Sequence, residues 1–357
     1  MSADRLSILC VSNMFPGPGD PDYGAFVADM CRELGEHGHD VKTAVIRTRT
    51  RGRLRSPLKY GSLGAATLAR ARRAEVIYAH YLFPTGALAA AAGHAHGVPW
   101  VITAHGRDVR NLEKAALRRA SRPGIEGAGA LIAVSEYLRE RLSEHGFSLP
   151  QTHVVNMGVS LERFQIHERH AARSRLRLDG DGPIVLAVGG LTKRKNPLML
   201  LRAFRRLFAE EPAARLVFVG DGPLAHEIDL TAANLGVAAA VIRPGSVPHD
   251  HVPDWMAASD VLAVVSTVEP LGQVALEALA SGRPVVATSE GGTREIVPAS
   301  GPGRHADPTD PDAIASALSE LVGSPPDPQA CRAAAAPHAL EIQAERVAAI
   351  LGGVLGP

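Results

Sequence analysis

The sequence predicts an α/β protein that consists of two doubly wound domains in succession. Three observations support this prediction: the length, an alternation of short apolar runs with helical stretches, and one interruption of that alternation near mid-chain. The chain has 357 residues, and at roughly 100–200 residues per domain this length favours two domains. Alternating strands and helices are typical of a parallel sheet that helices cover on both faces.

The first series of elements begins at the N-terminus. Residues 6–12 (LSILCVS) form an apolar run typical of a buried strand, and residues 24–39 place their apolar side chains near one face, as a helix does. Further strands are expected at residues 41–47, 75–81, 100–106, 130–135 and 152–159. Helical stretches fit between most of these runs, so the segment predicts one parallel sheet.

The alternation stops at residues 164–183, which are polar and carry no strand signal, so we interpret them as the interdomain connection. A second series of strands is expected at residues 184–190, 215–222, 240–245, 261–266 and 284–290. The alanine-rich segment at the C-terminus follows three prolines and predicts a helix that returns to the first domain. The predicted division is 1–168 with the helix at 336–357, and 169–335.

The composition narrows the class of protein. Hydrophobic residues make up 46% and charged residues 21% of the chain, which is enough apolar material for two cores and argues against disorder. The formal net charge of +1 argues against a nucleic-acid partner. Three widely separated cysteines form no CxxC pair and favour a reducing compartment. Neither a signal peptide nor a membrane-spanning run is recognisable, so we expect a soluble, cytoplasmic protein.

Residues 266–288 combine features that suit a phosphate-bearing ligand. A predicted strand ends at Ser266, a loop with Glu269 and Gly272 follows, and a helix with Glu277 comes next. The start of a helix offers unpaired N–H groups and the positive end of a dipole, which favour a phosphate. The alternative is that both glutamates are exposed surface carboxylates, and spacing by itself leaves this open.

The motif E-P-L-G-x4-E-A-L-A-x-G-x-P-V-V-A-T in this segment resembles the E-x7-E signature of retaining family-4 glycosyltransferases. Further motifs occur in that family's order: HGHDV (37–41), TAHGRD (103–108), AVS (133–135), VGGLx3KN (188–196), VGDGPL (219–224) and ASDVL (258–262). Together they extend over nearly the whole chain. The resemblance implies the GT-B fold, in which two Rossmann-like domains have a cleft between them.

The resemblance also implies how a nucleoside-diphosphate sugar would be bound. Glu277 would hold the nucleotide ribose, Glu269 would lie near the transferred sugar, and Lys195 would neutralise the diphosphate as its charge grows during bond cleavage. The predicted donor-binding residues are Gly24, Gly189, Gly190, Arg194, Lys195, Gly245, Glu269, Leu271, Gly272, Gln273, Val274 and Glu277.

Three residues are predicted on the acceptor side. His105 follows a strand of the first domain, and the resemblance places it between donor and acceptor. His80 also ends a strand. Asp108 either caps the next segment or contacts the acceptor, and the sequence leaves both open. We predict His105, Glu269 and Lys195 as the catalytic residues.

The chain departs from the family pattern at Gly190 and at Ser160. Gly190 stands where the family has an arginine, so one of two expected diphosphate cations is missing, and Arg194 or Lys193 would have to replace it. Ser160 stands where the family has an aspartate. The departure at Gly190 motivates the hypothesis of a non-catalytic nucleotide-sugar-binding partner.

Residues 47–73 contain nine basic residues and no acidic one. One interpretation is a solvated loop and helix. The other is a surface for an anionic acceptor or for anionic lipid head groups, in which case the protein would lie on the cytoplasmic face of a membrane. The D-x-D sequence at 179–181 is interpreted as a turn, and neither a metal nor another cofactor is expected.

The predicted function is transfer of a sugar from a nucleoside-diphosphate sugar, with UDP favoured, to a hydroxyl acceptor with retention of configuration. Polysaccharide, glycolipid and small-molecule glycoside biosynthesis are all compatible with it. A GT-B nucleotide-sugar epimerase, which needs no acceptor, is the alternative enzyme.

Overall fold

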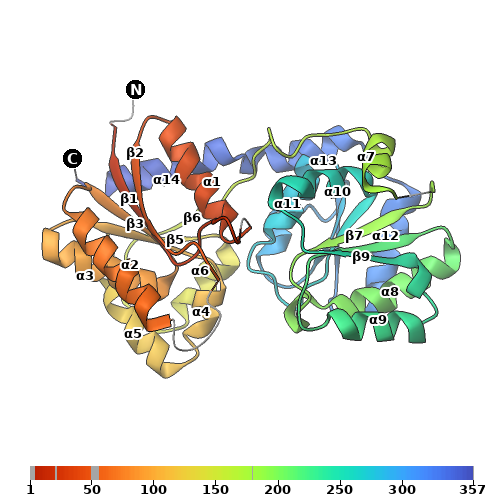
Figure 1. Ribbon diagram of the computed structural model, residues 1–357, viewed down its shortest axis with the longest axis horizontal. Coiled ribbons are helices and arrows are strands. Elements are labelled where there is room, and N and C mark those ends of the chain that lie inside the picture. The colour runs from red at the N-terminus through yellow and green to blue at the C-terminus, as the bar shows by residue number, and fades with distance from the viewer. Residues whose placement is uncertain (1–4, 21, 50–55, 179, 357) are drawn as a thin grey trace. The chain divides into compact units, whose positions relative to one another are not determined.

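A computed structural model describes residues 5–20, 22–49, 56–178 and 180–356 (Figure 1). The chain divides into two compact units: Met1–Gly158 with Leu340–Pro357, and Val159–Ala339. The sequence placed the first boundary at 168/169. Residues 159–168 instead belong to the second unit. Arg332 holds them there by donating hydrogen bonds to the carbonyl oxygens of Leu161 and Phe164, at 2.9 and 2.8 Å.

The first unit contains, within the described residues, a parallel six-stranded sheet in the order β2-β1-β3-β4-β5-β6. Its strands are β1 (Ser7–Ser12), β2 (Asp40–Val45), β3 (Val76–His80), β4 (Trp100–Ala104), β5 (Ala130–Ala133) and β6 (Thr152–Val154). Its helices are α1 (Ala25–Glu36), α2 (Ser56–Ala71), α3 (Ala87–His96), α4 (Arg107–Asn111), α5 (Ala115–Glu126), α6 (Glu136–Ser143) and α14 (Leu340–Gly353).

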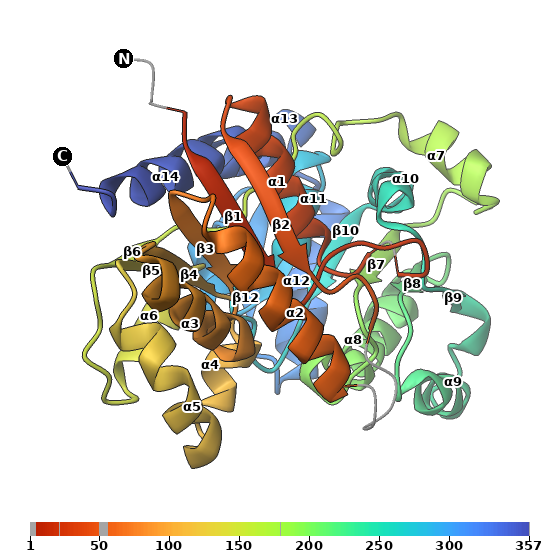
Figure 2. The same cartoon turned by 60° about the vertical axis from the view of Figure 1, so that its left-hand side comes forward.

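Helices cover both faces of this sheet, as the alternation predicted. The helices α2, α3 and α5 pack in a row on one face, and α1 packs with α14 on the other (Figure 1). Figure 2 shows α2 lying across β1 and β2. The middle residues of β1 are completely buried because the sheet is covered on both sides.

The second unit repeats the plan with a parallel sheet in the order β12-β11-β10-β7-β8-β9. Its strands are β7 (Ile184–Val188), β8 (Arg215–Val219), β9 (Val241–Gly245), β10 (Val261–Val264), β11 (Val285–Thr288) and β12 (Gly303–Ala306). Its helices are α7 (Arg169–Leu176), α8 (Pro197–Glu210), α9 (Ala225–Asn234), α10 (Val252–Ala258), α11 (Gln273–Ala280), α12 (Pro311–Gly323) and α13 (Pro328–Ala335). The helices α8, α9 and α12 pack together, as do α7 with α10 and α11 with α13.

Strand register brings the predicted polar residues to one edge of each sheet. In the first unit Ser12 pairs with His80, and His80 with Thr103. In the second unit Val188 pairs with Val219, and Val219 with Gly245. The loops that carry the predicted site residues therefore leave their sheets at the carboxyl ends of parallel strands, where ligands bind in such folds.

The predicted connection at 164–183 is wrong in part, because it contains the helix α7. Its polar character has a structural reason: Arg173 is only 3% exposed and donates to Asp260 Oδ2 at 2.7 Å and to the Ala258 carbonyl at 3.0 Å. These bonds attach α7 to the end of α10. Within the D-x-D sequence, Asp179 lies outside the described residues.

The predicted C-terminal helix is interrupted. The helix α13 ends at Ala335, a turn at 336–338 contains Pro337, and α14 starts at Leu340. The N–H of Val159 donates to the carbonyl of His338 at 2.9 Å, so the two crossings between the units lie side by side. The predicted strand at 152–159 is likewise shorter and ends at Val154.

Candidate functional site

Glu269 is the centre of a cluster of polar side chains in the second unit. Lys195 Nζ donates to its Oε2 at 2.6 Å, Ser266 Oγ at 2.7 Å, and Arg194 Nη1 at 3.1 Å. Glu269 is 7% exposed, and Ser266 is completely buried. The turn of residues 193–195 after β7 and the loop after β10 thus place three donors on one oxygen.

The charge state of Glu269 follows from this surrounding. Burial alone would raise the pKa of its carboxyl group, but the positive charges of Lys195 and Arg194 and the hydrogen bonds from Lys195 and Ser266 outweigh burial. The pKa of Glu269 is therefore lower than its ordinary value. The group is an anion that two cations neutralise, and a ligand phosphate could compete with it for those cations.

The helix α11 begins beside this cluster. Gly272 precedes it with a φ of 89°, and a Cβ atom there would lie 2.9 Å from Thr293 Oγ1 and 3.4 Å from Glu269 Cγ. Leu271 is buried, and Gln273 and Val274 are half-buried at the first turn. The glycine thus allows the backbone N–H groups of the helix start to lie close to Glu269.

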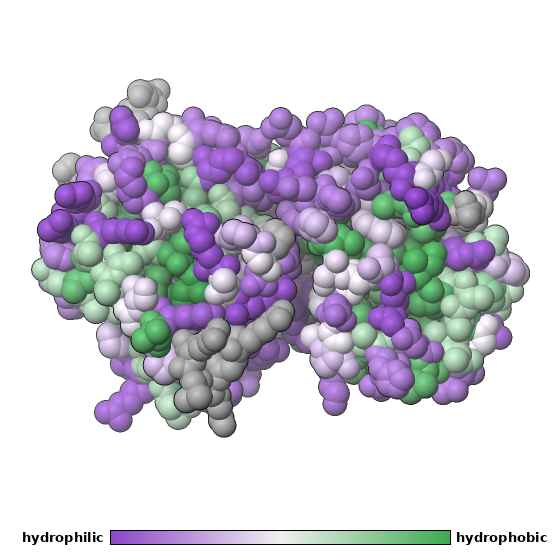
Figure 3. All heavy atoms as spheres, in the orientation of Figure 1, coloured by the Kyte–Doolittle hydropathy of each residue, from purple (hydrophilic) through white to green (hydrophobic). Residues whose placement is uncertain are grey.

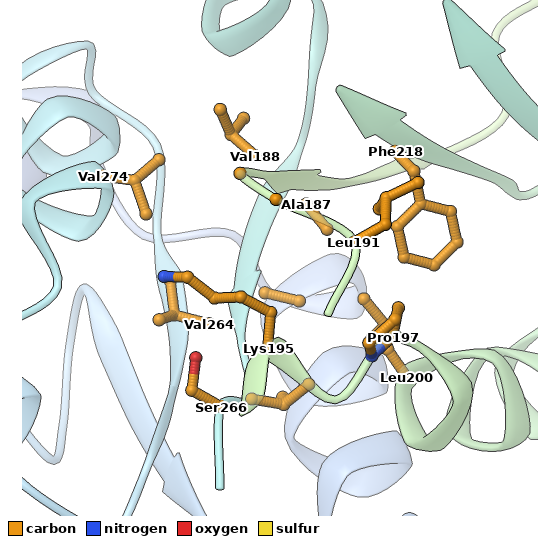
Figure 4. A pocket seen from close by; sticks show the side chains of 14 residues that line it. Ala187, Val188, Leu191, Lys195, Pro197, Leu200, Phe218, Val264, Ser266 and Val274 are labelled. Atoms are coloured by element: carbon orange, nitrogen blue, oxygen red, sulfur yellow. The ribbon is translucent and has the colours of Figure 1, made fainter. Parts of the chain in front are cut away.

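A small pocket, partly open to solvent, lies next to the cluster. It is lined by Gly189, Gly190 and Lys195 on one side and by Ser266 and Val274 on the other. Figure 4 shows the Lys195 side chain extending toward Val274, with Ser266 nearby and Phe218 at the opposite end. The structure therefore brings five predicted donor-binding positions to one cavity or its border: Gly189, Gly190, Lys195, Glu269 and Val274.

Gly189 and Gly190 occupy different backbone environments. Gly189 has a φ of 133°, and a Cβ there would lie 3.6 Å from Lys195 Cε. Gly190 is exposed, and a Cβ there would be 3.7 Å from Thr192 Cγ2 and 3.8 Å from the Asp221 carbonyl oxygen, which are ordinary contacts. The missing arginine at position 190 is therefore not explained by lack of space. Arg194, which contacts Glu269, is the cation that lies at the cluster in its place.

Glu277 lies in the second turn of α11 and is 7% exposed. Its Oε1 is 3.1 Å from Nε2 of His249, which begins a short turn after β9. Gly245 lies at the end of β9, where its carbonyl accepts from the N–H of Gly220 at 2.8 Å. The interpretation of both glutamates as exposed surface carboxylates is thus wrong.

The acceptor-side residues lie together in the first unit. His80 Nδ1 is 3.1 Å from His105 Nε2, and the two rings stack with their centroids 5.3 Å apart. Asp108 is 5% exposed and accepts from the N–H groups of Leu82, His105 and Gly106 at 3.0, 3.0 and 2.8 Å. The geometry gives Asp108 the capping role that the sequence left open, while its contact with an acceptor stays a prediction.

Both histidines are held in the neutral form. Burial and the neighbouring His105 hold the pKa of His80 well below its usual range, and burial lowers the pKa of His105 to about 3. His80 Nε2 is buried and has no hydrogen-bond partner among the described residues. A neutral His105 can accept or donate one hydrogen bond at a sugar hydroxyl without adding charge.

Gly24 directly precedes α1 in the first unit, where a Cβ would overlap the Met14 carbonyl. It lies in a different unit from the other donor-binding positions. Its predicted contact with a diphosphate stays a prediction.

The basic stretch is only partly described, since residues 50–55 fall outside the described ranges. Arg47 donates to the Pro16 carbonyl at 2.9 Å, Arg70 to the Thr43 carbonyl, and Lys59 to Thr48 Oγ1 at 2.9 Å. These contacts favour the interpretation of a solvated surface for those three cations. Arg72 and Arg73 are exposed beyond them.

The described residues contain no group of three or more His, Cys, Asp or Glu side chains arranged to hold a metal ion. Within the same residues, no helix has both the length and the apolar character to cross a membrane.

Sequence reasoning missed Ser266 and the contact between His249 and Glu277. Ser266 was noted only as the end of a strand, although it stands three residues before Glu269, a spacing that suits a loop contact. His249 and Glu277 are 28 residues apart in the sequence, so no local signal links the two.

Two protein families match the chain, approximately one for each unit. Glycosyltransferase Family 4 matches residues 24–163, and Glycosyl transferases group 1 matches residues 168–337. A D-inositol 3-phosphate glycosyltransferase of Catenulispora acidiphila is 32% identical over 302 residues, which cover 79% of this chain and 72% of the relative. A GDP-mannose-dependent phosphatidylinositol monomannoside mannosyltransferase of Mycolicibacterium smegmatis is 35% identical, over 66% of this chain and 61% of the relative.

Solved structures with similar folds cover almost the whole chain. Sucrose-phosphate synthase of Thermosynechococcus elongatus matches with a TM-score of 0.73 at 20% identity, over 98% of this chain and 96% of that one. The Anabaena protein Alr3699/HepE in complex with UDP and glucose matches with a TM-score of 0.73 at 22% identity, over 98% of each chain. The predicted GT-B fold, with two doubly wound parallel sheets, is confirmed.

Proposed function

We propose a specific reaction for this chain, which belongs to the family-4 glycosyltransferases. It transfers a sugar from a nucleoside-diphosphate sugar, with UDP as the nucleotide, to an acceptor hydroxyl. The anomeric configuration is retained. One observation carries this proposal: Lys195, Arg194 and Ser266 converge on Glu269 beside the first turn of α11. Two cations and a helix N-terminus there suit a diphosphate.

The proposed mechanism relies on charge stabilisation and positioning. As the glycosidic bond breaks, negative charge grows on the leaving diphosphate, and Lys195 and Arg194 stabilise it. The acceptor hydroxyl attacks the face from which the diphosphate leaves, and a phosphate oxygen takes the hydroxyl proton. Glu269 lies near the transferred sugar, where its negative charge stabilises an oxocarbenium-like transition state.

His105 serves the acceptor side in this proposal. Its neutral ring hydrogen-bonds a sugar hydroxyl, and Asp108 holds the backbone at His105 and Gly106 in place. No metal ion takes part, because the two cations supply the positive charge. The same transfer could serve polysaccharide, glycolipid or small-molecule glycoside synthesis.

The similar proteins differ in the nucleotide that their names give. The Anabaena structure contains UDP, whereas the Mycolicibacterium smegmatis relative depends on GDP-mannose. We retain UDP as the first choice and make GDP the main competing outcome of the test.

The first experiment is thermal unfolding of the purified protein with UDP, GDP, ADP and TDP in the presence of a chelator. A ligand at 100 times its dissociation constant stabilises a protein by about 2.7 kcal/mol. We expect a shift with UDP that is lost in Lys195→Ala. A shift with GDP alone would change the nucleotide and leave the reaction class intact, whereas no shift with any nucleotide would contradict the donor site.

A second experiment separates transfer from epimerisation. The matching nucleotide sugar is incubated with and without acceptor hydroxyl compounds, and free nucleotide is measured. A transferase releases nucleotide in proportion to the product formed and leaves the donor sugar unchanged when no acceptor is present. Appearance of an epimerised sugar would overturn the proposal.

The proposal also includes the basic stretch at residues 47–73. We propose that the exposed face of α2 contacts an anionic surface on the cytoplasmic side of a membrane. Leu58 is 83% and Leu68 45% exposed on this helix, and Arg72 and Arg73, which follow its end, are exposed as well. In Figure 3 the visible face of the first unit mixes hydrophilic and hydrophobic areas.

A further inference from the structure

We infer that His249 is a positioning residue that holds the Glu277 carboxylate for the nucleotide ribose, and that Arg163 fixes the tautomer of His249. This inference rests on the proposed function, in which Glu277 binds the ribose. It assigns a role to residues that neither the E-x7-E motif nor its spacing includes.

Three side chains from separate segments form a chain of contacts. Arg163 Nη1 is 3.3 Å from His249 Nδ1, and His249 Nε2 is 3.1 Å from Glu277 Oε1. The Phe164 ring packs edge-on against the imidazole with the centroids 5.7 Å apart. Side-chain exposures of 22% for His249 and 9% for Glu277 leave little room for solvent to replace these contacts.

The identity of the groups decides the direction of each hydrogen bond. A guanidinium group has only donors and stays protonated, so Nδ1 of His249 must accept from Arg163. The neutral imidazole then carries its proton on Nε2, which donates to Glu277 Oε1. The carboxylate is thereby held in one orientation, and its Oε2, which has no partner among the described residues, is left to accept from ribose hydroxyls.

Ser160 supports the start of this chain of contacts. Its Oγ accepts from the backbone N–H of Arg163 at 3.2 Å and so stabilises the turn that carries the guanidinium group. Arg163 Nε also lies 3.8 Å from Asp250 Oδ1. The serine that replaces the family aspartate therefore has a local structural function in this chain.

The test compares two ligands and two variants. Binding of UDP and of 2′,3′-dideoxy-UDP is measured by calorimetry for the wild type, His249→Ala and His249→Gln. We expect His249→Ala to weaken UDP binding about tenfold, since a hydrogen bond to a charged group is lost. The affinity for the dideoxy compound should stay unchanged, because that ligand has no ribose hydroxyls for Glu277 to bind.

His249→Gln provides the conservative rescue. Its amide oxygen can accept from Arg163 while its N–H donates to Glu277, so UDP affinity should return to within about threefold of the wild type. In turnover assays His249→Ala should raise KM for the donor and leave kcat nearly unchanged. His251→Ala is the matched control, because His251 is exposed on the same short turn.

Each outcome decides between the hypotheses. Equal losses for both ligands in His249→Ala, or no loss for either, would overturn the role of His249 and leave the donor site standing. If UDP fails to bind the wild type, the panel is repeated with GDP and its dideoxy analogue. Failure of the wild type to bind any nucleoside diphosphate would overturn the proposed function, and this inference with it.

Discussion

At the scale of single residues, Lys195 donates to Glu269 and is the cation proposed for the diphosphate. We expect Lys195→Ala to weaken nucleoside-diphosphate binding by about tenfold or more, because charge-assisted hydrogen bonds are about twice as strong as neutral ones. Titration calorimetry measures this change. Lys193→Ala is the control, since Lys193 is an exposed neighbour. Equal losses in both variants would point to general electrostatics instead of a specific contact.

A substitution at Gly190 tests the opposite effect, a gain in nucleoside-diphosphate affinity. A Cβ at this position meets only ordinary contacts, so Gly190→Arg adds a cation without strain. We expect nucleoside-diphosphate affinity to rise by about tenfold at low salt and by less at high salt, since screening weakens exposed charges. Binding titrations at two ionic strengths measure this effect.

Gly189→Ala is the matched comparison for that variant. Gly189 has a φ of 133°, which a side chain tolerates poorly, so this change should lower Tm without any gain in affinity. A gain in both variants would mean that the loop changes shape and would contradict the interpretation of Gly190 as a missing cation.

Single residues also show how much of the candidate site the sequence alone predicts. Glu269, Glu277 and Lys195 were identified because they stand at motif positions, and the structure places all three in the second unit. Ser266, Arg163 and His249 were missed as contacts because hydrogen bonds between distant segments leave no periodic pattern in a sequence.

At the scale of elements, the start of α11 depends on one backbone conformation. Gly272→Ala puts a Cβ 2.9 Å from Thr293 Oγ1 at a φ of 89°. The strain of such a conformation costs about 1–3 kcal/mol, so thermal unfolding should show a lower Tm and calorimetry a weaker nucleotide affinity. The control is Gly301→Ala, where φ is 64° but no atom lies within 4 Å. A larger loss in the control would contradict the role of the close approach to Thr293.

The ends of β3 and β4 bring the buried His80 and the half-buried His105 together in their neutral forms, and this makes stability depend on pH. The pKa of His105 is about 3 in the folded state, whereas an unfolded histidine titrates near 6.5. Between these values the unfolded chain binds more protons, so the stabilisation is complete above about pH 6.5 and is lost as the pH falls.

We therefore expect the unfolding free energy to decrease on acidification below about pH 6.5, by about 1.4 kcal/mol per pH unit for each such histidine. His105→Gln should reduce that slope by one proton in denaturant titrations at pH 7, 6 and 5. An unchanged slope in the variant would show that His105 binds its proton as readily in the folded protein as in the unfolded chain, and would contradict a lowered pKa of His105.

At the scale of the whole molecule, the exposed face of α2 predicts salt-dependent binding to anionic vesicles. We expect sedimentation with vesicles that contain phosphatidylglycerol and none with pure phosphatidylcholine, since each basic residue near an anionic surface contributes about 1 kcal/mol. Reversing the charge of Arg72 and Arg73 to glutamate should reduce the bound fraction. The same change at Arg202 and Arg205, exposed on α8, is the control. Equal binding to both vesicle types would contradict an electrostatic contact.

The sequence by itself determined the doubly wound α/β architecture, the family and the segment that carries both glutamates. Apolar periodicity and motif order are local properties, so a linear chain displays them directly. The tertiary structure decided which side chains meet: it converted a polar connection into the anchored helix α7, gave Asp108 its backbone partners and joined His249 to Glu277. Such contacts depend on strand register and helix packing, which no local pattern encodes.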